Sequence, residues 1–179
     1  MKSEFEYLET MLEEFLNKDY VIERLYVIDS MDITGWEIWF QIEFSFFLAN
    51  HESEPEWYRE YLFAIDARKD KLRSYAKPDF LIRKKGWARD RYAALEVKLH
   101  PSATSCVSNV LADFDKVRKI RNSEIDLRSY WGLGFCRERD LAAVESIIDD
   151  KSYEKGYDLS PNYRVVRNIH DTAFSYFII

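Results

Sequence analysis

Two side chains with complementary chemistry, Glu96 and Lys98, share one face of a segment that alternates like a β-strand, residues 92–99. A carboxylate can hold a hard cation, and an ammonium group can stabilise negative charge. The opposite face of the segment carries only apolar side chains, namely Ala93, Leu95, Val97 and Leu99. An acid and a base on the outer face of a strand are ordinary surface residues, so this pair defines a site only if further groups join it.

Asp79 is the first such group. If residues 80–84 and 92–99 pair as an antiparallel hairpin centred between Trp87 and Ala88, Asp79 lies opposite Glu96 at a Cβ separation of about 4.5–5.5 Å. Two carboxylates about 5 Å apart repel by about 3 kcal/mol at an effective dielectric constant near 20. A divalent cation would relieve this repulsion, and oxygen ligands without His or Cys favour Mg²⁺, or Mn²⁺ as a substitute, over Zn²⁺.

A predicted helix over residues 35–49 supplies a third acid. Thr34 and Glu37 fit a capping box, which gives Glu37 a structural role. On a helical wheel Glu37 and Gln41 belong to a polar stripe, whereas Glu43 lies roughly opposite, among large aromatic residues. Glu43 is therefore expected to point inward, where an ionised carboxylate needs either a basic partner or a place in a site.

The other elements follow from hydrophobic periodicity. They are a helix over residues 3–17, a short strand near 21–28, strands over 61–67, 80–84 and 92–99, a helix over 106–121, a strand over 130–136, a helix over 138–149, and two strands at the end of the chain. Residues 50–56 are expected to form a polar loop. No repeat or linker divides the chain, which predicts a single α/β domain over residues 1–179.

Two motifs carry a resemblance to a known superfamily. Residues 77–82, Lys-Pro-Asp-Phe-Leu-Ile, followed by residues 94–98, Ala-Leu-Glu-Val-Lys, resemble the signature of the PD-(D/E)XK nucleases. The order of the predicted elements over about residues 35–150 is similar to the restriction-endonuclease-like αβββαβ core, a mixed central β-sheet flanked by helices. The first and last segments would be elaborations of that core, and no separate DNA-binding module is recognisable.

The resemblance implies a Mg²⁺-dependent DNA endonuclease that hydrolyses phosphodiester bonds with a metal-activated water. Asp79 and Glu96 would be catalytic residues that bind the metal, with the carbonyl of Val97 as a further ligand. Lys98 would orient and help deprotonate the attacking water, or stabilise the charge that develops on the phosphate.

Two residues of the helix over residues 35–49 are assigned by the same resemblance. Glu43 would complete the catalytic and metal-binding set, directly or through water. Gln41 is an outside candidate, because some members of the superfamily use a Gln near the site.

Charge is strongly segregated along the chain, although the net charge is only −6. Residues 1–66 hold 16 acidic and 4 basic side chains, residues 67–121 hold 6 and 15, and residues 122–179 hold 10 and 7. The basic middle segment could attract phosphate through its local potential, or it could neutralise the acidic first third within the fold.

Basic side chains gather in two places of that middle segment. Four of them, Lys84, Lys85, Arg89 and Arg91, are expected in the hairpin loop and are candidates for contacts with nucleic acid. His100, at the strand end, is a further candidate. An exposed loop is also often charged without any such role. A second cluster, comprising Lys116, Arg118, Lys119 and Arg121, lies at a predicted helix end, where cations also favour the helix dipole.

Two other interpretations remain open. The nuclease-like fold could be a catalytically inactive module that binds nucleic acid or a protein partner, or the charges could only decorate the surface of an α/β domain. If the protein cuts both DNA strands, a homodimer would suit the symmetry of the duplex. Two cysteines without metal-ligand spacing, no signal segment and no membrane-length apolar stretch predict a cytoplasmic protein.

Overall fold

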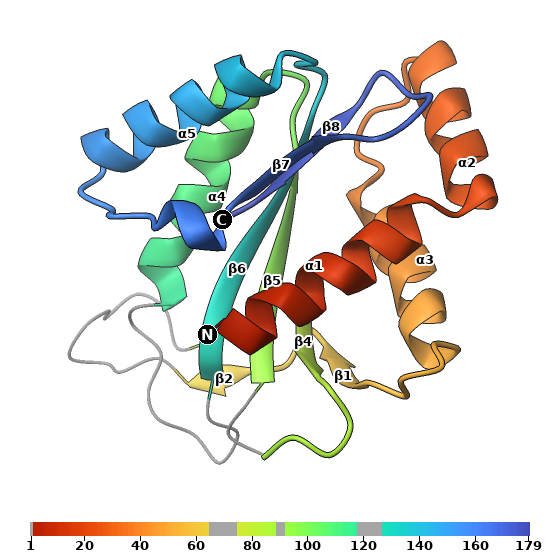
Figure 1. Cartoon of the computed structure of the whole chain (residues 1–179), viewed down its shortest axis with the longest axis vertical. Coiled ribbons are helices and arrows are strands. Elements are labelled where there is room, and N and C mark those ends of the chain that lie inside the picture. The colour runs from red at the N-terminus through yellow and green to blue at the C-terminus, as the bar shows by residue number, and fades with distance from the viewer. Residues whose placement is uncertain (1, 65–74, 89–91, 118–126) are drawn as a thin grey trace.

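A mixed six-stranded β-sheet with helices on both faces forms the body of the protein (Figure 1). The structure is a computed structural model that describes residues 2–64, 75–88, 92–117 and 127–179. The α/β class with a mixed sheet flanked by helices, predicted from the sequence, is therefore confirmed.

Five α-helices occur in the described residues: α1 (Lys2–Leu16), α2 (Asp19–Ser30), α3 (Glu37–Ala49), α4 (Ala103–Val117) and α5 (Leu141–Glu154). The six strands of the main sheet are β1 (Glu56–Arg59), β4 (Phe80–Arg83), β5 (Tyr92–Leu99), β6 (Leu127–Cys136), β7 (Val165–Asn168) and β8 (Ser175–Ile178). Two short strands, β2 (Phe63–Ala64) and β3 (Tyr75–Ala76), pair separately, and a 3₁₀ turn, η1 (Pro161–Tyr163), precedes β7.

The strand order β1-β4-β5-β6-β8-β7 places β5 inside the sheet. β4 and β5 pair antiparallel with Phe80 opposite Leu95, which is the register predicted from the hairpin centre. β5 and β6 run parallel and pair over the full length of β5. Parallel pairing requires a crossover, and α4 supplies it.

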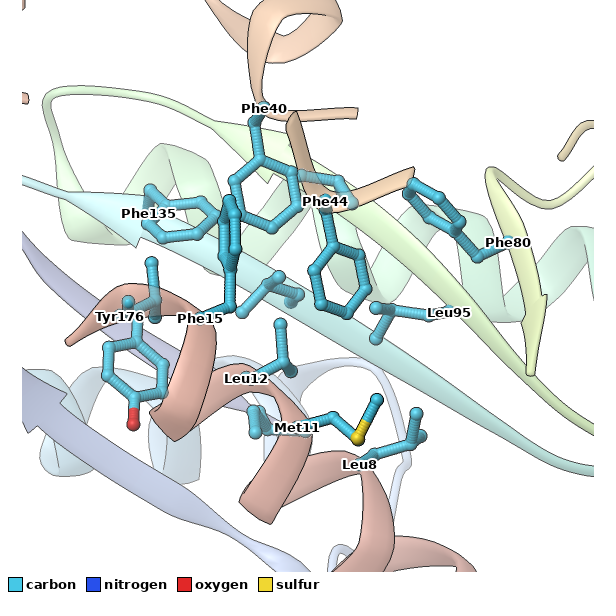
Figure 2. Close-up of a cluster of buried hydrophobic side chains, with 14 of the residues drawn as sticks. Leu8, Met11, Leu12, Phe15, Phe40, Phe44, Phe80, Leu95, Phe135 and Tyr176 are labelled. Carbon is cyan, nitrogen blue, oxygen red and sulfur yellow. The ribbon is translucent and has the colours of Figure 1, made fainter. Parts of the chain in front are cut away.

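Helices α1, α2 and α3 cover one face of the sheet, and α4 and α5 cover the other (Figure 1). On the first face Phe15 of α1 packs against Phe40 and Phe44 of α3 (Figure 2). Phe40 in turn contacts Phe135 of β6, and Phe44 contacts Phe80 of β4. The odd-numbered residues of β5 face this core, so the predicted alternation of β5 is confirmed. The even-numbered residues consequently face the side on which α4 packs.

Several predictions about local structure are wrong. Residues 21–28 belong to α2 rather than to a strand, because Val21, Leu25 and Ile28 are buried at helical spacing. The strand that joins the main sheet ahead of β4 is β1, which begins at the last residue of the predicted loop 50–56 and was not predicted as a strand. Among the described residues, β2, within the predicted strand 61–67, pairs with β3 and not with the main sheet.

The ends of several elements also differ from the predictions. The predicted capping box at α3 is absent: the N-cap position is Trp36, and no side chain caps the helix. α4 begins at Ala103, three residues early, and residues 118–121 of its predicted range lie outside the described residues. α5 begins at Leu141, three residues late, and ends at Glu154, five residues beyond its predicted end, and the two terminal strands are confirmed. Within the described ranges, no helix combines the length and apolarity needed to cross a lipid bilayer.

Gly132 in β6 lets α4 approach the sheet closely. A Cβ at this position would collide with the side chain of Val110 and approach Phe114. We expect Gly132→Ala to lower the free energy of unfolding by about 1–3 kcal/mol, because the helix must shift or its side chains must leave their rotamers. Urea unfolding measures this change. Thr104→Ala, at an exposed position of the same helix, is the control and should change stability by less than about 0.5 kcal/mol; equal effects of both would contradict the close approach.

Candidate functional site

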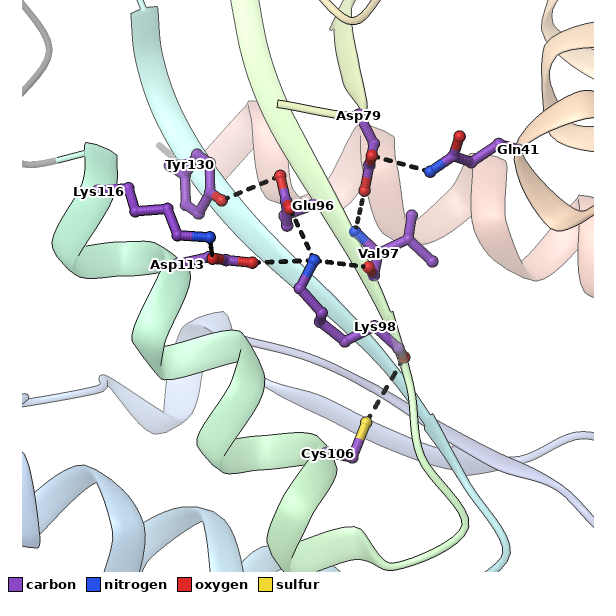
Figure 3. Close-up of polar contacts among 9 residues, drawn as sticks. All are labelled: Gln41, Asp79, Glu96, Val97, Lys98, Cys106, Asp113, Lys116 and Tyr130. Carbon is purple, nitrogen blue, oxygen red and sulfur yellow. Dashed lines mark hydrogen bonds and ion pairs between the residues drawn. The ribbon is translucent and has the colours of Figure 1, made fainter. Parts of the chain in front are cut away.

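The candidate site lies at the N-terminal end of β4, where β5 extends beyond its pairing with β4. β4 starts at Phe80, whereas β5 runs on to Leu99, so Val97 has no β4 residue paired with it. The side chain of Asp79 occupies this place: its Oδ2 accepts a hydrogen bond of 2.7 Å from the backbone N–H of Val97. The predicted position of Asp79, beside Glu96 at the end of the hairpin, is thus confirmed (Figure 3).

Gln41 of α3 holds the other oxygen of this carboxylate. Its Nε2 donates to Asp79 Oδ1 at 2.8 Å, and its Oε1 accepts a 2.7 Å hydrogen bond from Arg59 of β1. The Gln41 side chain is buried, with 2% exposure. Because each end of the amide has its own partner, Gln41 connects β1 to Asp79 and orients the carboxylate.

Lys98 lies at the centre of the contacts drawn in Figure 3. Its ammonium group is 2.7 Å from Glu96 Oε1, 2.9 Å from Asp113 Oδ2 and 3.2 Å from the carbonyl oxygen of Val97. Glu96 and Lys98 project from the same face of β5, as predicted, and α4 brings Asp113 to that face. One cation therefore links two acids from different elements.

Two further side chains border this group from α4 and β6. Lys116 pairs with the buried carboxylate of Asp113, and the hydroxyl of Tyr130 lies 3.4 Å from Glu96 Oε2 (Figure 3). A cleft of about 200 Å³ opens here. Its lining includes Glu96, Asp113, Lys116 and Tyr130, together with residues 75–78.

The acids on β5 and before β4 resist ionisation in this environment. Burial, followed by the negative charge of Asp79, raises the pKa of Glu96 to about 7. Burial also raises the pKa of Asp79, although the hydrogen bond from Val97 and the charge of Lys98 oppose the change. The surroundings of Asp79 and Glu96 therefore favour the neutral form of each carboxyl group more than water does.

For the ion pair between Lys98 and Asp113, in contrast, the pKa shifts favour the charged form of both side chains. Burial acts to lower the pKa of Lys98, but the carboxylates of Glu96 and Asp113 outweigh burial, so this pKa lies above its usual range. For Asp113, burial acts to raise the pKa, and hydrogen bonds from Lys116 and Lys98 reverse the effect and lower it. Lys98 is consequently an ammonium ion at neutral pH, unsuited to take up a proton from water.

The prediction that Glu43 joins this site is wrong in its geometry. Glu43 lies on the side of α3 that faces α2 and pairs with Arg24 at 3.4 Å, which is the structural alternative for an inward acid. The acid of α3 that lies near the site is Glu37, one helical turn before Gln41. Burial raises the pKa of Glu37; the charge of Lys98 opposes this change, and the charge of Asp79 adds to it.

The candidate nucleic-acid contacts are only partly described by the structure. Lys84 lies over the ring of Tyr7 at 5.8 Å, and Lys85 pairs with Glu54. His100 Nδ1 accepts a hydrogen bond from the backbone N–H of Ser102. Arg89 and Arg91 lie outside the described residues, as do Arg118, Lys119 and Arg121 of the second cluster.

Lys84 and Lys85, in the loop between β4 and β5, also lie away from the carboxylates of Asp79 and Glu96. The loop joins β4 and β5 at the end of the hairpin opposite Asp79 and Glu96. Tyr92, where β5 begins, is four residues from Glu96, or about 13 Å along the strand. Contact between this loop and nucleic acid stays a prediction.

Asp113 and Tyr130 were not predicted as members of the site. Asp113 is three residues after Val110 and four before Val117, so an acid interrupts the apolar face of a predicted helix. That interruption is a signal the sequence contains. Tyr130 gives no comparable signal, because a Tyr at the start of a strand is common.

Comparison with models of protein families, with curated proteins and with solved structures found no match to this chain.

The raised pKa of Glu96 predicts a specific dependence of stability on pH. Between pH 4.5, its usual pKa, and pH 7 the unfolded chain has lost this proton and the folded chain still holds it, so stability falls as pH rises. Glu96→Gln removes the titration, and we expect it to add up to about 3 kcal/mol to stability at pH 8 relative to the wild type, with little difference at pH 4. Urea unfolding across this range measures the difference. Parallel curves for the two proteins would contradict a raised pKa of Glu96 in the folded state.

Proposed function

We propose that the protein is a Mg²⁺-dependent endonuclease that hydrolyses phosphodiester bonds of DNA, with the restriction-endonuclease-like fold that its motifs resemble. The observation that carries the proposal is the meeting of Asp79, Glu96 and Lys98 at the end of one hairpin. The two acids lie close enough for the charge of Asp79 to raise the pKa of Glu96, and the ammonium group of Lys98 lies beside Glu96. Apart from β2 and β3, which pair separately, the order α3, β1, β4, β5, α4, β6 supports the resemblance of the core.

The donor groups present fit a magnesium ion. Asp79 and Glu96 offer carboxylate oxygens, the Val97 carbonyl points toward the same ammonium group as Glu96, and all of these are hard ligands of the kind Mg²⁺ prefers. Burial raises the pKa of both acids although Lys98 opposes the change, and a divalent cation would stabilise their ionised forms further. In the described part of the chain no cluster of three or more His, Cys, Asp or Glu side chains could hold a metal ion. Mg²⁺ is commonly bound by only one or two protein carboxylates, with water completing its shell.

Each side chain of the site then has a distinct task. When bound, Mg²⁺ neutralises charge on the phosphate and makes water a better nucleophile. Gln41 and the N–H of Val97 hold Asp79 in one orientation. Lys98, kept charged by Glu96 and Asp113, stabilises negative charge that develops on the phosphate; of the two roles implied for it, its raised pKa supports this one.

Binding without cleavage is the second candidate function, and one observation favours it. The ammonium group of Lys98 already has two carboxylate partners, and that of Lys116 has one, so neither cation is free to meet a phosphate without giving up a contact. Affinity for DNA or for a protein, with no turnover and no effect of Lys98→Ala, would establish this alternative.

Cleavage of supercoiled plasmid in Mg²⁺, and its absence in chelator, tests the proposal. We expect Asp79→Asn and Lys98→Met each to lower the rate at least about a hundredfold, because the first removes a proposed metal ligand and the second the permanent cation. Glu43→Gln is the matched control: its acid pairs with Arg24 away from the site, so the rate should stay within about twofold. Absence of cleavage on both DNA and RNA, with the protein folded by circular dichroism, would contradict the nuclease proposal.

Gln41 provides a test of the support around Asp79. Gln41→Leu keeps the apolar contacts of α3 but removes the hydrogen bond to Asp79 Oδ1. Loss of a residue that orients a metal ligand typically lowers metal affinity or activity by about 10–100-fold. We expect cleavage to fall by this factor, with a higher Mg²⁺ concentration at half-maximal rate. A variant with wild-type cleavage and Mg²⁺ dependence would show that Asp79 does not need this orientation.

A further inference from the structure

Exposed hydrophobic side chains are concentrated on α2, α3 and the turn between them. Among the described residues, seven of the eleven large hydrophobic side chains that are exposed lie between residues 26 and 46. They are Tyr26, Val27, Met31, Ile33, Ile38, Ile42 and Phe46. Single exposed hydrophobic residues are normal, but a cluster of this kind marks an interaction surface.

Three of these side chains form a stripe along the outer side of α3. Ile38, Ile42 and Phe46 are four residues apart and 55–65% exposed. The opposite side of the same helix buries Phe40 and Phe44 against α1 (Figure 2). The stripe therefore adds nothing to the core, although it makes α3 apolar on nearly all sides.

Helix α2 lies beside α3 and extends this surface. Arg24 of α2 and Glu43 of α3 connect the two helices, and both helices lie at one edge of the molecule in Figure 1. Val27 follows Arg24 by three residues, so it lies on the side of α2 whose Arg24 reaches α3. Met31 directly follows the last residue of α2.

The charge around these residues is negative. Of the six acids in residues 18–50, Glu43 pairs with Arg24, Asp29 and Asp32 pair with Arg137, and Glu37 lies near the candidate site, which leaves Asp19 and Glu23. Asp19 and Glu23 are exposed on α2, and neither has an ion-pair partner among the residues the structure describes. A second copy of this chain bound through the same surface would bring equal negative charges together, which is unfavourable. A positively charged partner has the complementary charge.

We propose that the outer surface of α2 and α3 binds an amphipathic helix of a partner protein, with an apolar face bordered by Lys and Arg. A helix laid along α3 can interdigitate with side chains spaced by four residues. Basic residues at its border would meet the acids of α2. This surface is separate from the carboxylates and lysines of the candidate site and does not depend on the proposed nuclease activity.

Two synthetic peptides test this inference, one an amphipathic helix of Leu and Lys and the other of the same composition in scrambled order. Isothermal titration with the full chain should give a dissociation constant at least about tenfold lower for the ordered peptide. Ile42→Ser combined with Phe46→Ser should weaken its binding at least about tenfold, since both side chains are exposed and the fold does not need them. Tyr153→Ser, which removes the 88% exposed Tyr153 of α5, is the matched control and should leave binding unchanged.

Charge and location are tested separately. Glu23→Lys should weaken binding of the ordered peptide and reduce its dependence on salt. Methyl signals of Ile38 and Ile42 should shift when the ordered peptide is added. Equal affinity for both peptides, or full affinity in the Ile42→Ser, Phe46→Ser variant, would overturn the proposal. A dimer by light scattering that this variant dissociates would show instead that a second copy occupies the surface, and it would also overturn the proposal.

Discussion

The candidate site depends on the two hydrogen bonds that Asp79 accepts. Its carboxylate replaces a strand partner for the N–H of Val97 and also accepts from Gln41, so it joins the end of the β4–β5 hairpin to α3. β6 pairs with β5 along its whole length, which prevents β5 from sliding relative to the sheet. The position of Glu96 and Lys98 relative to Asp79 is therefore a property of the sheet, and it does not rely on the two side chains alone.

The fold stabilises some of the charges in the site and destabilises others. Burial disfavours ionised Asp79 and Glu96, and repulsion from nearby carboxylates adds to the effect, while Asp113 is buried as a full charge because Lys98 and Lys116 neutralise it. An apolar core would be more stable than such a group. An acid with a strongly perturbed pKa that lines a cleft, as Glu96 does, is typical of functional sites, and the neighbouring Asp79 supports a bound cation in the proposed function.

Local patterns predicted much of the fold, and their failures have identifiable causes. The alternation of β5 and the centre of its hairpin gave the correct register, because a one-residue slip would turn Leu95 away from the core beneath α1–α3 and place Glu96 in that core. The β-branched residues of α2 favoured a strand, yet the burial of Leu25 with Val21 and Ile28 requires a helix. On α3 the exposed Ile38, Ile42 and Phe46 balance the buried face, so helical periodicity could not show which side points inward.

Residue order alone was sufficient to pair Asp79 with Glu96 and to put Lys98 on the same face, since strand alternation and hairpin register are local constraints. Packing between distant elements decided the rest: Gln41 rather than Glu43 contacts Asp79, and Asp113 arrives from α4 to hold Lys98. These contacts depend on the rotation of each helix about its own axis and on its distance from the sheet. Both quantities are set by the complete set of buried side chains, which no single segment contains.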